Sequence, residues 1–252
     1  MDKIKTTHVG SLPRSKKLSE ILFKKDKNEL FDQGELDKII EEDVNKIVKK
    51  QIDIGIDIIS DGEMSKISYA TYVKDRLHGF SGESERRAPK DLDDFPSYKE
   101  KIAKSGGTPT YTRPCCTADL KIKDTKSLTK DISNLKSALK KNNHSHGFIN
   151  SASPGVISNF LPNKFYKSDD DYLQALSKIM KTEYDEITKN DLFLQIDCPD
   201  LALARHMTFK NVSDEEFLVR AEKQIECLNE AIKDIDASKL RMHICWGNYE
   251  GP

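Results

Sequence analysis

A histidine and a cysteine two residues apart, near the end of the chain, are the side chains best suited to hold a metal. His243 and Cys245 lie in an apolar segment, residues 240–245, that predicts a strand. Because residues i and i+2 of a strand point to the same face, the imidazole and the thiol are expected side by side. Zinc takes nitrogen and sulfur ligands, usually four, so this pair could supply half of a zinc site. Taken alone, such a pair is more often a core cysteine next to a hydrogen-bonded histidine.

Two carboxylates follow predicted buried strands and are candidate catalytic groups. Glu63 comes after the strand at 57–60, and Asp197 comes after the strand at 192–196. Two such groups could act as general acid and base, or could bind an ammonium group. The alternative for both is a surface acid or a helix cap. Asp197 precedes Pro199 directly after a buried strand, which favours an inward, functional position.

A glycine turn near the N-terminus could bind an anion. Gly10 allows close backbone approach, Ser11 offers a hydroxyl, and Arg14 can hold a carboxylate by two hydrogen bonds. A plain turn explains the same residues equally well.

Composition limits the kind of partner. The chain has 252 residues, 37% hydrophobic and 33% charged, which suits one or two domains with a sizeable core. With 41 basic and 42 acidic residues there is no strong field for nucleic acid or an anionic membrane. No apolar run approaches the roughly 20 residues of a membrane span, and no signal core is present, so we expect a cytoplasmic protein. The 5 irregularly spaced cysteines argue against a disulfide framework.

Strands and helices alternate along the chain. The expected strands lie near residues 3–9, 57–60, 115–122, 147–150, 192–196 and 240–245. The expected helices lie at 35–52, 64–78, 126–141, 169–189 and 214–234. This order predicts a parallel sheet with helices outside it, and polar residues gather just after the strands, where a (β/α)8 barrel builds its active site. We therefore predict an α/β fold: a single TIM (β/α)8-type barrel domain over 1–252, truncated after its sixth strand, with a long excursion at 79–114.

Five ordered motifs together resemble a known family. They are residues 7–14 (THVGSLPR), 61–63 (DGE), 153–157 (SPGVI) with 160–163 (FLPN), 195–202 (QIDCPDLA) and 241–252 (RMHICWGNYEGP). This set resembles the cobalamin-independent methionine synthase family, and in particular its short, single-barrel members that match the catalytic C-terminal domain of the long enzyme. The resemblance spans nearly the whole chain.

The resemblance implies a zinc-dependent methyltransferase. Its substrates would be 5-methyltetrahydrofolate, or a related donor, and the thiol of homocysteine, and its product methionine. His243 and Cys245 match the family's zinc ligands, while a Glu and a further Cys that complete its site come from late strands that this sequence does not contain. Val9 and Ser11 match contacts to the amino-acid part of homocysteine, and Glu63 and Asp197 match the carboxylates that hold its ammonium group.

Other interpretations remain open from the sequence. The chain could be a non-catalytic, truncated barrel fragment, or a zinc-dependent alkyltransferase for another thiol such as coenzyme M. A metal-free barrel of the uroporphyrinogen decarboxylase type would leave His243 and Cys245 unexplained. We expect the chain alone to bind zinc weakly, and we expect the missing C-terminal barrel segment, or a second copy in a homo-oligomer, as its macromolecular partner.

Overall fold

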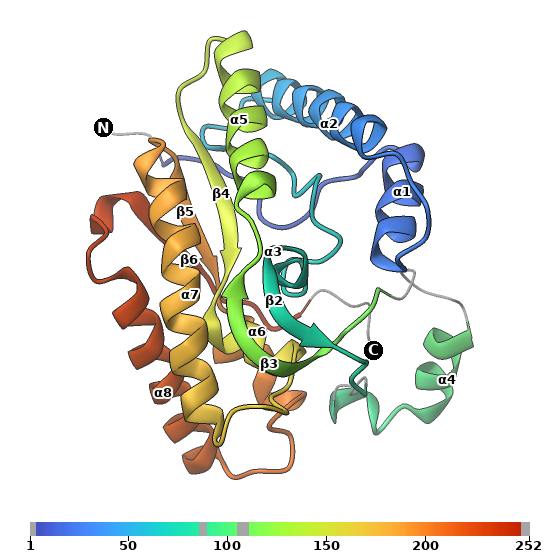
Figure 1. Cartoon of the computed structure of the whole chain (residues 1–252), viewed down its shortest axis with the longest axis vertical. Coiled ribbons are helices and arrows are strands. Elements are labelled where there is room, and N and C mark those ends of the chain that lie inside the picture. The colour runs from blue at the N-terminus through green and yellow to red at the C-terminus, as the bar shows by residue number, and fades with distance from the viewer. Residues whose placement is uncertain (1–3, 86–89, 105–110, 248–252) are drawn as a thin grey trace.

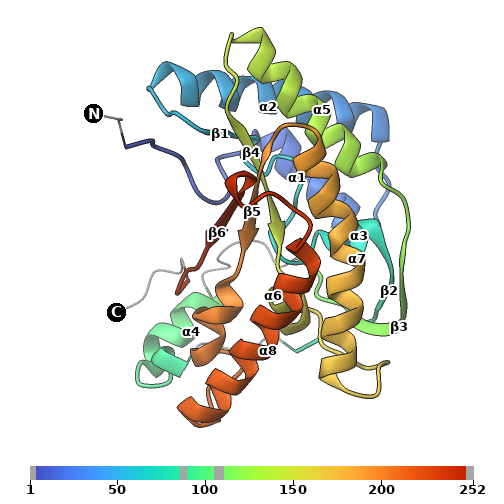
Figure 2. The ribbon, with the colours of Figure 1, turned by 90° about the vertical axis from the view of Figure 1, so that its left-hand side faces the viewer.

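A four-stranded parallel sheet carries the fold. The computed structural model describes residues 4–85, 90–104 and 111–247. The sheet has the order β1 (Ile59–Ser60), β4 (Gly147–Ala152), β5 (Phe193–Asp197) and β6 (Leu240–His243). Figure 2 shows these strands side by side, with β6 at one edge of the sheet. Every residue of β4 is buried, as expected for a parallel strand covered on both faces.

Helices that connect the strands pack against this sheet. The long ones are α2 (Gln33–Asp53), α5 (Lys126–Lys141), α7 (Asp169–Lys189) and α8 (Asp214–Ile232). In Figure 1, α7 and α8 lie on one flank of the sheet and α2 and α5 lie at its upper end. α5 and α7 contact β4, and α8 packs on α7. The shorter elements are α1 (Lys16–Asp26), α3 (Val73–Arg76), α4 (Pro96–Lys104), α6 (Pro154–Phe160) and the 3-10 turns η1 (Lys90–Leu92), η2 (Pro199–Leu201), η3 (Leu203–His206) and η4 (Ala237–Lys239).

Local capping explains where the long C-terminal helices begin. The Ser168 hydroxyl accepts a hydrogen bond from the Asp171 amide (3.0 Å), and three aspartates fill the first turn of α7. Ser213 and Glu216 form the predicted capping box of α8. The helices predicted at 126–141 and 169–189 are confirmed to the residue.

The strand at 115–122 exists, but its predicted place in the parallel sheet is wrong. β3 (Cys115–Ile122) pairs antiparallel with β2 (Leu77–Ser81) in a separate two-stranded sheet. Only Cys115, Cys116 and Leu120 of β3 are buried. A half-exposed strand of this kind suits a ribbon at the rim of the fold, whereas strands of the central sheet are covered on both faces.

The helix predicted at 64–78 is also wrong. Turns occupy 62–65 and 69–72, and only α3 and the start of β2 follow. Polar side chains in this stretch, Lys66, Ser68 and Thr71, are buried and point into the protein instead of forming a helix surface. The strand expected at 3–9 shrinks to a single parallel bridge between Thr7 and Ile58.

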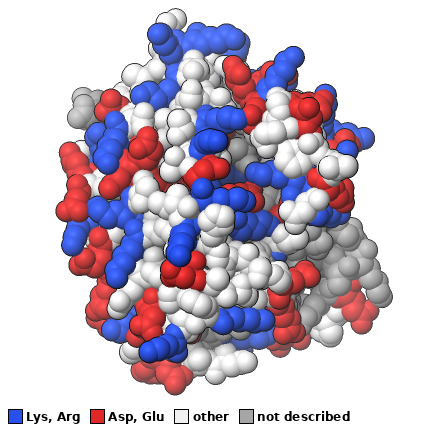
Figure 3. Space-filling view, viewed as in Figure 1, with Lys and Arg blue, Asp and Glu red and all other residues white. Residues whose placement is uncertain are grey.

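The 79–114 excursion contains regular structure that periodicity did not reveal. The end of β2, η1 and α4 all fall in it, while residues 86–89 and 105–110 lie outside the described part. The helices α1 and α6 were likewise not predicted. On the face seen in Figure 3, Lys and Arg are interspersed with Asp and Glu. No helix in the described ranges combines the length and apolar character that a membrane crossing needs.

Candidate functional site

The carboxyl ends of the parallel strands bring the candidate residues together. Glu63 follows β1, Asn150 lies in β4, Asp197 ends β5 and His243 ends β6. The register pairs Ala152 with Asp197 and Asp197 with His243. Residues separated by tens of positions in the chain therefore share one edge of the sheet, where α/β barrels place their active sites.

His243 is oriented by Asp197. Its Nδ1 lies 3.1 Å from Asp197 Oδ1, which leaves Nε2 as the nitrogen available to a metal. The hydrogen bond to Asp197, followed by one to Cys245, raises the pKa of the His243 imidazole to about 10. Carboxylates that hold a metal-binding histidine in this way are a common support for zinc ligands. His243 therefore has a free ring nitrogen for a metal, and Asp197 holds the imidazole ring in place as carboxylates do at zinc sites.

The described residues supply only part of a complete zinc site. Cys245 is a free, partly buried thiol beside His243. Within the described ranges, no group of three or more His, Cys, Asp and Glu side chains is arranged to hold a metal ion. A structural or catalytic zinc site needs three or four protein ligands. His243 and Cys245 thus fit as two of them, and Asn248 to Pro252, which belong to the same sequence motif, lie outside the described residues.

Glu63 sits on a tight turn that points its carboxylate inward. Both Gly62 and Glu63 have left-handed backbone angles, φ 67° and 57°. The Glu63 amide donates to Asp61 Oδ1 (2.9 Å), and Ser11 Oγ donates to Glu63 Oε2 (2.8 Å). The side chain is only 4% exposed, and this burial raises the pKa of its carboxyl, an effect that the nearby Lys66 ammonium opposes. The surface-acid alternative for Glu63 is therefore wrong.

The N-terminal turn supports Glu63 instead of presenting an arginine to an anion. Arg14 Nη2 donates to the carbonyl oxygens of Glu63 (2.8 Å) and Lys66 (2.6 Å), so this part of its guanidinium is occupied. Ser11 donates to the Glu63 carboxylate. Val9, two residues earlier, is 39% exposed at the rim. The binding roles of Val9 and Ser11 stay predictions.

Asn150 is a member of the site that sequence analysis did not identify. Its Nδ2 donates to both Glu63 Oε1 (3.0 Å) and Asp197 Oδ2 (2.7 Å). Lys66 Nζ donates to Asn150 Oδ1 (3.0 Å), and Gln195 Nε2 donates to Asp197 Oδ1 (2.8 Å). The available signal was a polar residue directly after Phe148 and Ile149 in a strand predicted to be buried, since a buried amide needs partners.

Two aromatic side chains and an arginine pack together next to α6. Tyr69 and Phe160 meet edge to face with ring centroids 5.8 Å apart, and the Arg113 guanidinium lies 4.8 Å above the Phe160 ring. Burial raises the pKa of the Tyr69 phenol well above its ordinary value. Tyr69, Phe160 and Arg113 therefore form one packed cluster, the Phe160 wall.

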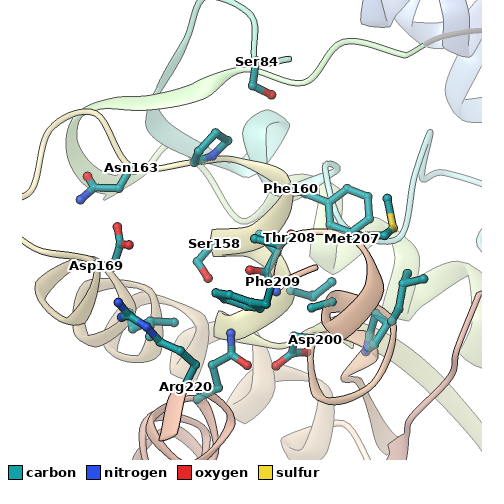
Figure 4. A pocket seen from close by; sticks show the side chains of 18 of the residues that line it. Ser84, Ser158, Phe160, Asn163, Asp169, Asp200, Met207, Thr208, Phe209 and Arg220 are labelled. Atoms are coloured by element: carbon teal, nitrogen blue, oxygen red, sulfur yellow. The ribbon is translucent and has the colours of Figure 1, made fainter. Parts of the chain in front are cut away.

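A cavity of about 400 Å³ adjoins the Phe160 wall on the side of α6 and η3 (Figure 4). Phe160, Met207 and Phe209 give it apolar surface, and Asp200 lies in its wall. Burial raises the pKa of the Asp200 carboxyl to about 6, although a hydrogen bond from Ser153 Oγ (2.7 Å) favours the ionised form. The volume is enough for a small organic molecule.

Comparison with known proteins gives consistent matches. Residues 4–250 match the family described as "Cobalamin-independent synthase, Catalytic domain". The methionine synthase of Sulfolobus acidocaldarius is 25% identical over 245 residues, which cover 97% of this chain and 62% of that protein. The methionine synthase of Sulfurisphaera tokodaii is 27% identical over 246 residues, with the same coverages of 97% and 62%. This chain therefore spans less than two thirds of the length of these relatives.

Solved structures match the fold. A B12-independent methionine synthase from a Shewanella species, in complex with selenomethionine, aligns with TM-score 0.62 and 21% identity, covering 86% of this chain and 54% of that one. A putative vitamin-B12 independent methionine synthase from Listeria monocytogenes aligns with TM-score 0.65 and 20% identity, covering 98% and 68%. These matches confirm the predicted α/β barrel class, of which the described residues form four parallel strands that end with β6.

Proposed function

This chain belongs to the cobalamin-independent synthase family, and from that premise we propose that it takes part in methyl transfer to the thiol of homocysteine, giving methionine. The methyl donor would be 5-methyltetrahydrofolate or a related compound. One observation carries the proposal: His243 and Cys245 lie beside a buried carboxylate pair, Glu63 and Asp197, at the carboxyl edge of the sheet. The histidine and the cysteine offer the nitrogen and sulfur ligands that zinc takes. The two carboxylates can accept hydrogen bonds from an ammonium group, so the whole arrangement suits a substrate that carries both a thiol and an amino-acid group.

The carboxylate pair would hold the substrate by its ammonium group. Glu63 is 4% exposed and Asp197 is 3% exposed, so a cation bound between them is shielded from water. Charge-assisted hydrogen bonds are about twice as strong as neutral ones. Ser11 and Val9, at the rim, are proposed to contact the rest of the amino-acid moiety. Holding the tail at fixed points orients the thiol toward Cys245, a positioning contribution.

His243 and Cys245 would supply two zinc ligands. Zinc, when bound, favours the thiolate form of a substrate thiol at neutral pH, and the thiolate is the nucleophile. Asp197 would keep the His243 ring in place through Nδ1, in addition to its proposed contact with the ammonium group. The remaining ligands would come from outside the described residues.

The metal proposal is tested by zinc analysis of the purified 252-residue chain. We expect weak zinc binding in the wild type and none in Cys245→Ser or His243→Ala, because each variant removes one of the two ligands that are grouped in the described part of the chain. Cys227→Ser is the matched control, since Cys227 is a free thiol on α8. Zinc that binds equally to the wild type and to Cys245→Ser would refute the assignment.

The reaction is tested with a panel of donors and thiols. Methylated products are measured by mass spectrometry with 5-methyltetrahydrofolate and with methylcobalamin, each offered homocysteine or coenzyme M. We expect methionine to form, and we expect His243→Ala to abolish it. Thiol methylation that His243→Ala leaves unchanged would rule out the proposed site.

The buried carboxylates favour homocysteine over coenzyme M. Coenzyme M carries a sulfonate and no ammonium group, so Glu63 and Asp197 would repel it. A non-catalytic fragment is the second candidate, favoured by the presence of only two grouped ligands among the described residues. An inactive chain that still binds methionine would support it.

A further inference from the structure

One amide joins the two carboxylates of the proposed substrate site. Asn150 Nδ2 donates to Glu63 Oε1 (3.0 Å) and to Asp197 Oδ2 (2.7 Å). A primary amide has two N–H donors, and here each is used on a different carboxylate. Glu63 follows β1 and Asp197 ends β5; β4 separates these two strands in the sheet, and Asn150 lies in β4. The position of each acid is therefore tied to the other through a side chain of the intervening strand.

Lys66 determines which way the Asn150 amide points. Its Nζ donates to Asn150 Oδ1 (3.0 Å) and also to the Asn150 backbone carbonyl. A lysine ammonium has three donors and no acceptor, so it can face only the oxygen of the amide. A flipped amide would set NH2 against the ammonium and oxygen against two carboxylates. Lys66 thus forces Nδ2 toward Glu63 and Asp197.

Lys66 is also the buried positive charge closest to the asparagine. It is 1% exposed, its Nζ lies 4.6 Å from the centre of the Tyr72 ring, and its side-chain hydrogen bonds go to Asn150. A buried ammonium is costly unless nearby negative charge compensates it. Its charge lowers the pKa of Glu63, acting against burial. Asp197 in turn pairs with His243 (Nδ1 to Oδ1, 3.1 Å), and Asp61 acts on Glu63 as a further negative charge, so these groups form one connected network.

We propose that Lys66 and Asn150 form a relay that positions Glu63 and Asp197 as a paired receptor for one ammonium group. The inference rests on the proposed function and deepens it. Neither residue of the relay needs to touch the substrate, so both are positioning residues. The relay makes the site selective for thiols and thioethers that carry an α-ammonium group.

The test measures selectivity in the absence of methyl transfer. Binding of L-methionine is compared by calorimetry with binding of 4-(methylthio)butanoate, which keeps the carboxylate and the thioether but lacks the ammonium group. The proteins are the full wild-type chain, Asn150→Leu, Lys66→Met and the control Ser177→Ala. Ser177 is buried, and its Oγ donates to the Cys227 carbonyl (2.6 Å) between α7 and α8, away from the relay.

We expect the wild type and Ser177→Ala to bind L-methionine more tightly than the desamino analogue. In both relay variants, the ratio of the two affinities should fall at least tenfold. A tenfold change in affinity corresponds to about 1.4 kcal/mol, which is the size expected for one hydrogen bond to a charged group. Binding of the desamino analogue should change by less than twofold. If Asn150→Leu does not fold, Asn150→Ser replaces it, because a serine hydroxyl is too short to reach both acids.

Three results would overturn the proposal. Folded relay variants that keep the wild-type preference would refute positioning. Equal weakening of both ligands would show a general structural role only. A wild-type chain that binds both ligands equally, or neither, would refute the ammonium site itself and the proposed acceptor class with it. Failure of methyl transfer alone, with selective binding intact, would refute the proposed reaction and leave the relay standing.

Discussion

The Gly155→Ala variant should unfold at a markedly lower urea concentration than the wild type. Gly155 is the second residue of α6, after the cap Ser153 and Pro154. A Cβ at this position would lie 2.1 Å from Asp200 Oδ2 and 3.0 Å from Gln224 Cδ. Asp200 is 3% exposed and Gln224 is 4% exposed, and both line the cavity beside α6, so relief of the clash requires these side chains to shift toward that cavity.

The expected loss of stability is about 3 kcal/mol. Overpacking a core position costs about 1–3 kcal/mol. Displacing Asp200 also weakens its hydrogen bond from Ser153 Oγ (2.7 Å), which contributes about 1.5–3 kcal/mol when the carboxylate is charged. Alanine regains up to about 1 kcal/mol through its helix propensity. Urea unfolding followed by far-ultraviolet circular dichroism, at constant m-value, measures the difference.

Gly34→Ala is the matched control. Gly34 is also the second residue of its helix, α2, but a Cβ there meets only Asp32 Oδ1, at 3.3 Å. We expect its stability to stay within about 1 kcal/mol of wild type, on the favourable side. The double variant Gly155→Ala with Asp200→Ala should lose less than the two single losses combined. Equal stability of Gly155→Ala and Gly34→Ala would refute the argument.

Two further predictions concern buried charges. Arg76→Met should destabilise the fold by about 3–5 kcal/mol in the same urea assay. Arg76 donates to Glu183 (2.7 Å) and Asp131 (2.5 Å), and its loss leaves two buried acids without their cation. The control Lys49→Met breaks an exposed ion pair with Asp53 and should cost less than about 1 kcal/mol. The pKa of Asp200 is raised from 3.8 to about 6, so its contribution to stability is present below pH 3.8 and is lost as pH rises through 6. Between pH 5 and 7 the wild type should therefore lose roughly 1 kcal/mol more than Asp200→Asn, and parallel pH profiles would contradict the raised pKa.

Segments with strong local signals were predicted well from the sequence. The 3.6-residue apolar period and the polar caps placed α5 and α7 at their observed bounds, and Ser213 with Glu216 marked the start of α8. Both signals act over a few residues, so neighbours in the chain suffice to determine them. The stretches at 64–78 and 115–122 failed for the opposite reason, since long-range packing decides their structure.

The residue types at the site were determined by the sequence alone: His243 and Cys245 as zinc-type ligands, and Glu63 and Asp197 as carboxylates after strands. Which of these residues lie in contact with one another was decided by the tertiary structure. Strand register sets Asp197 against His243, and β4 brings Asn150 between two acids that are far apart in the chain. A side chain's chemistry belongs to one residue, whereas its neighbours, burial and pKa depend on how distant strands align, which no local pattern encodes.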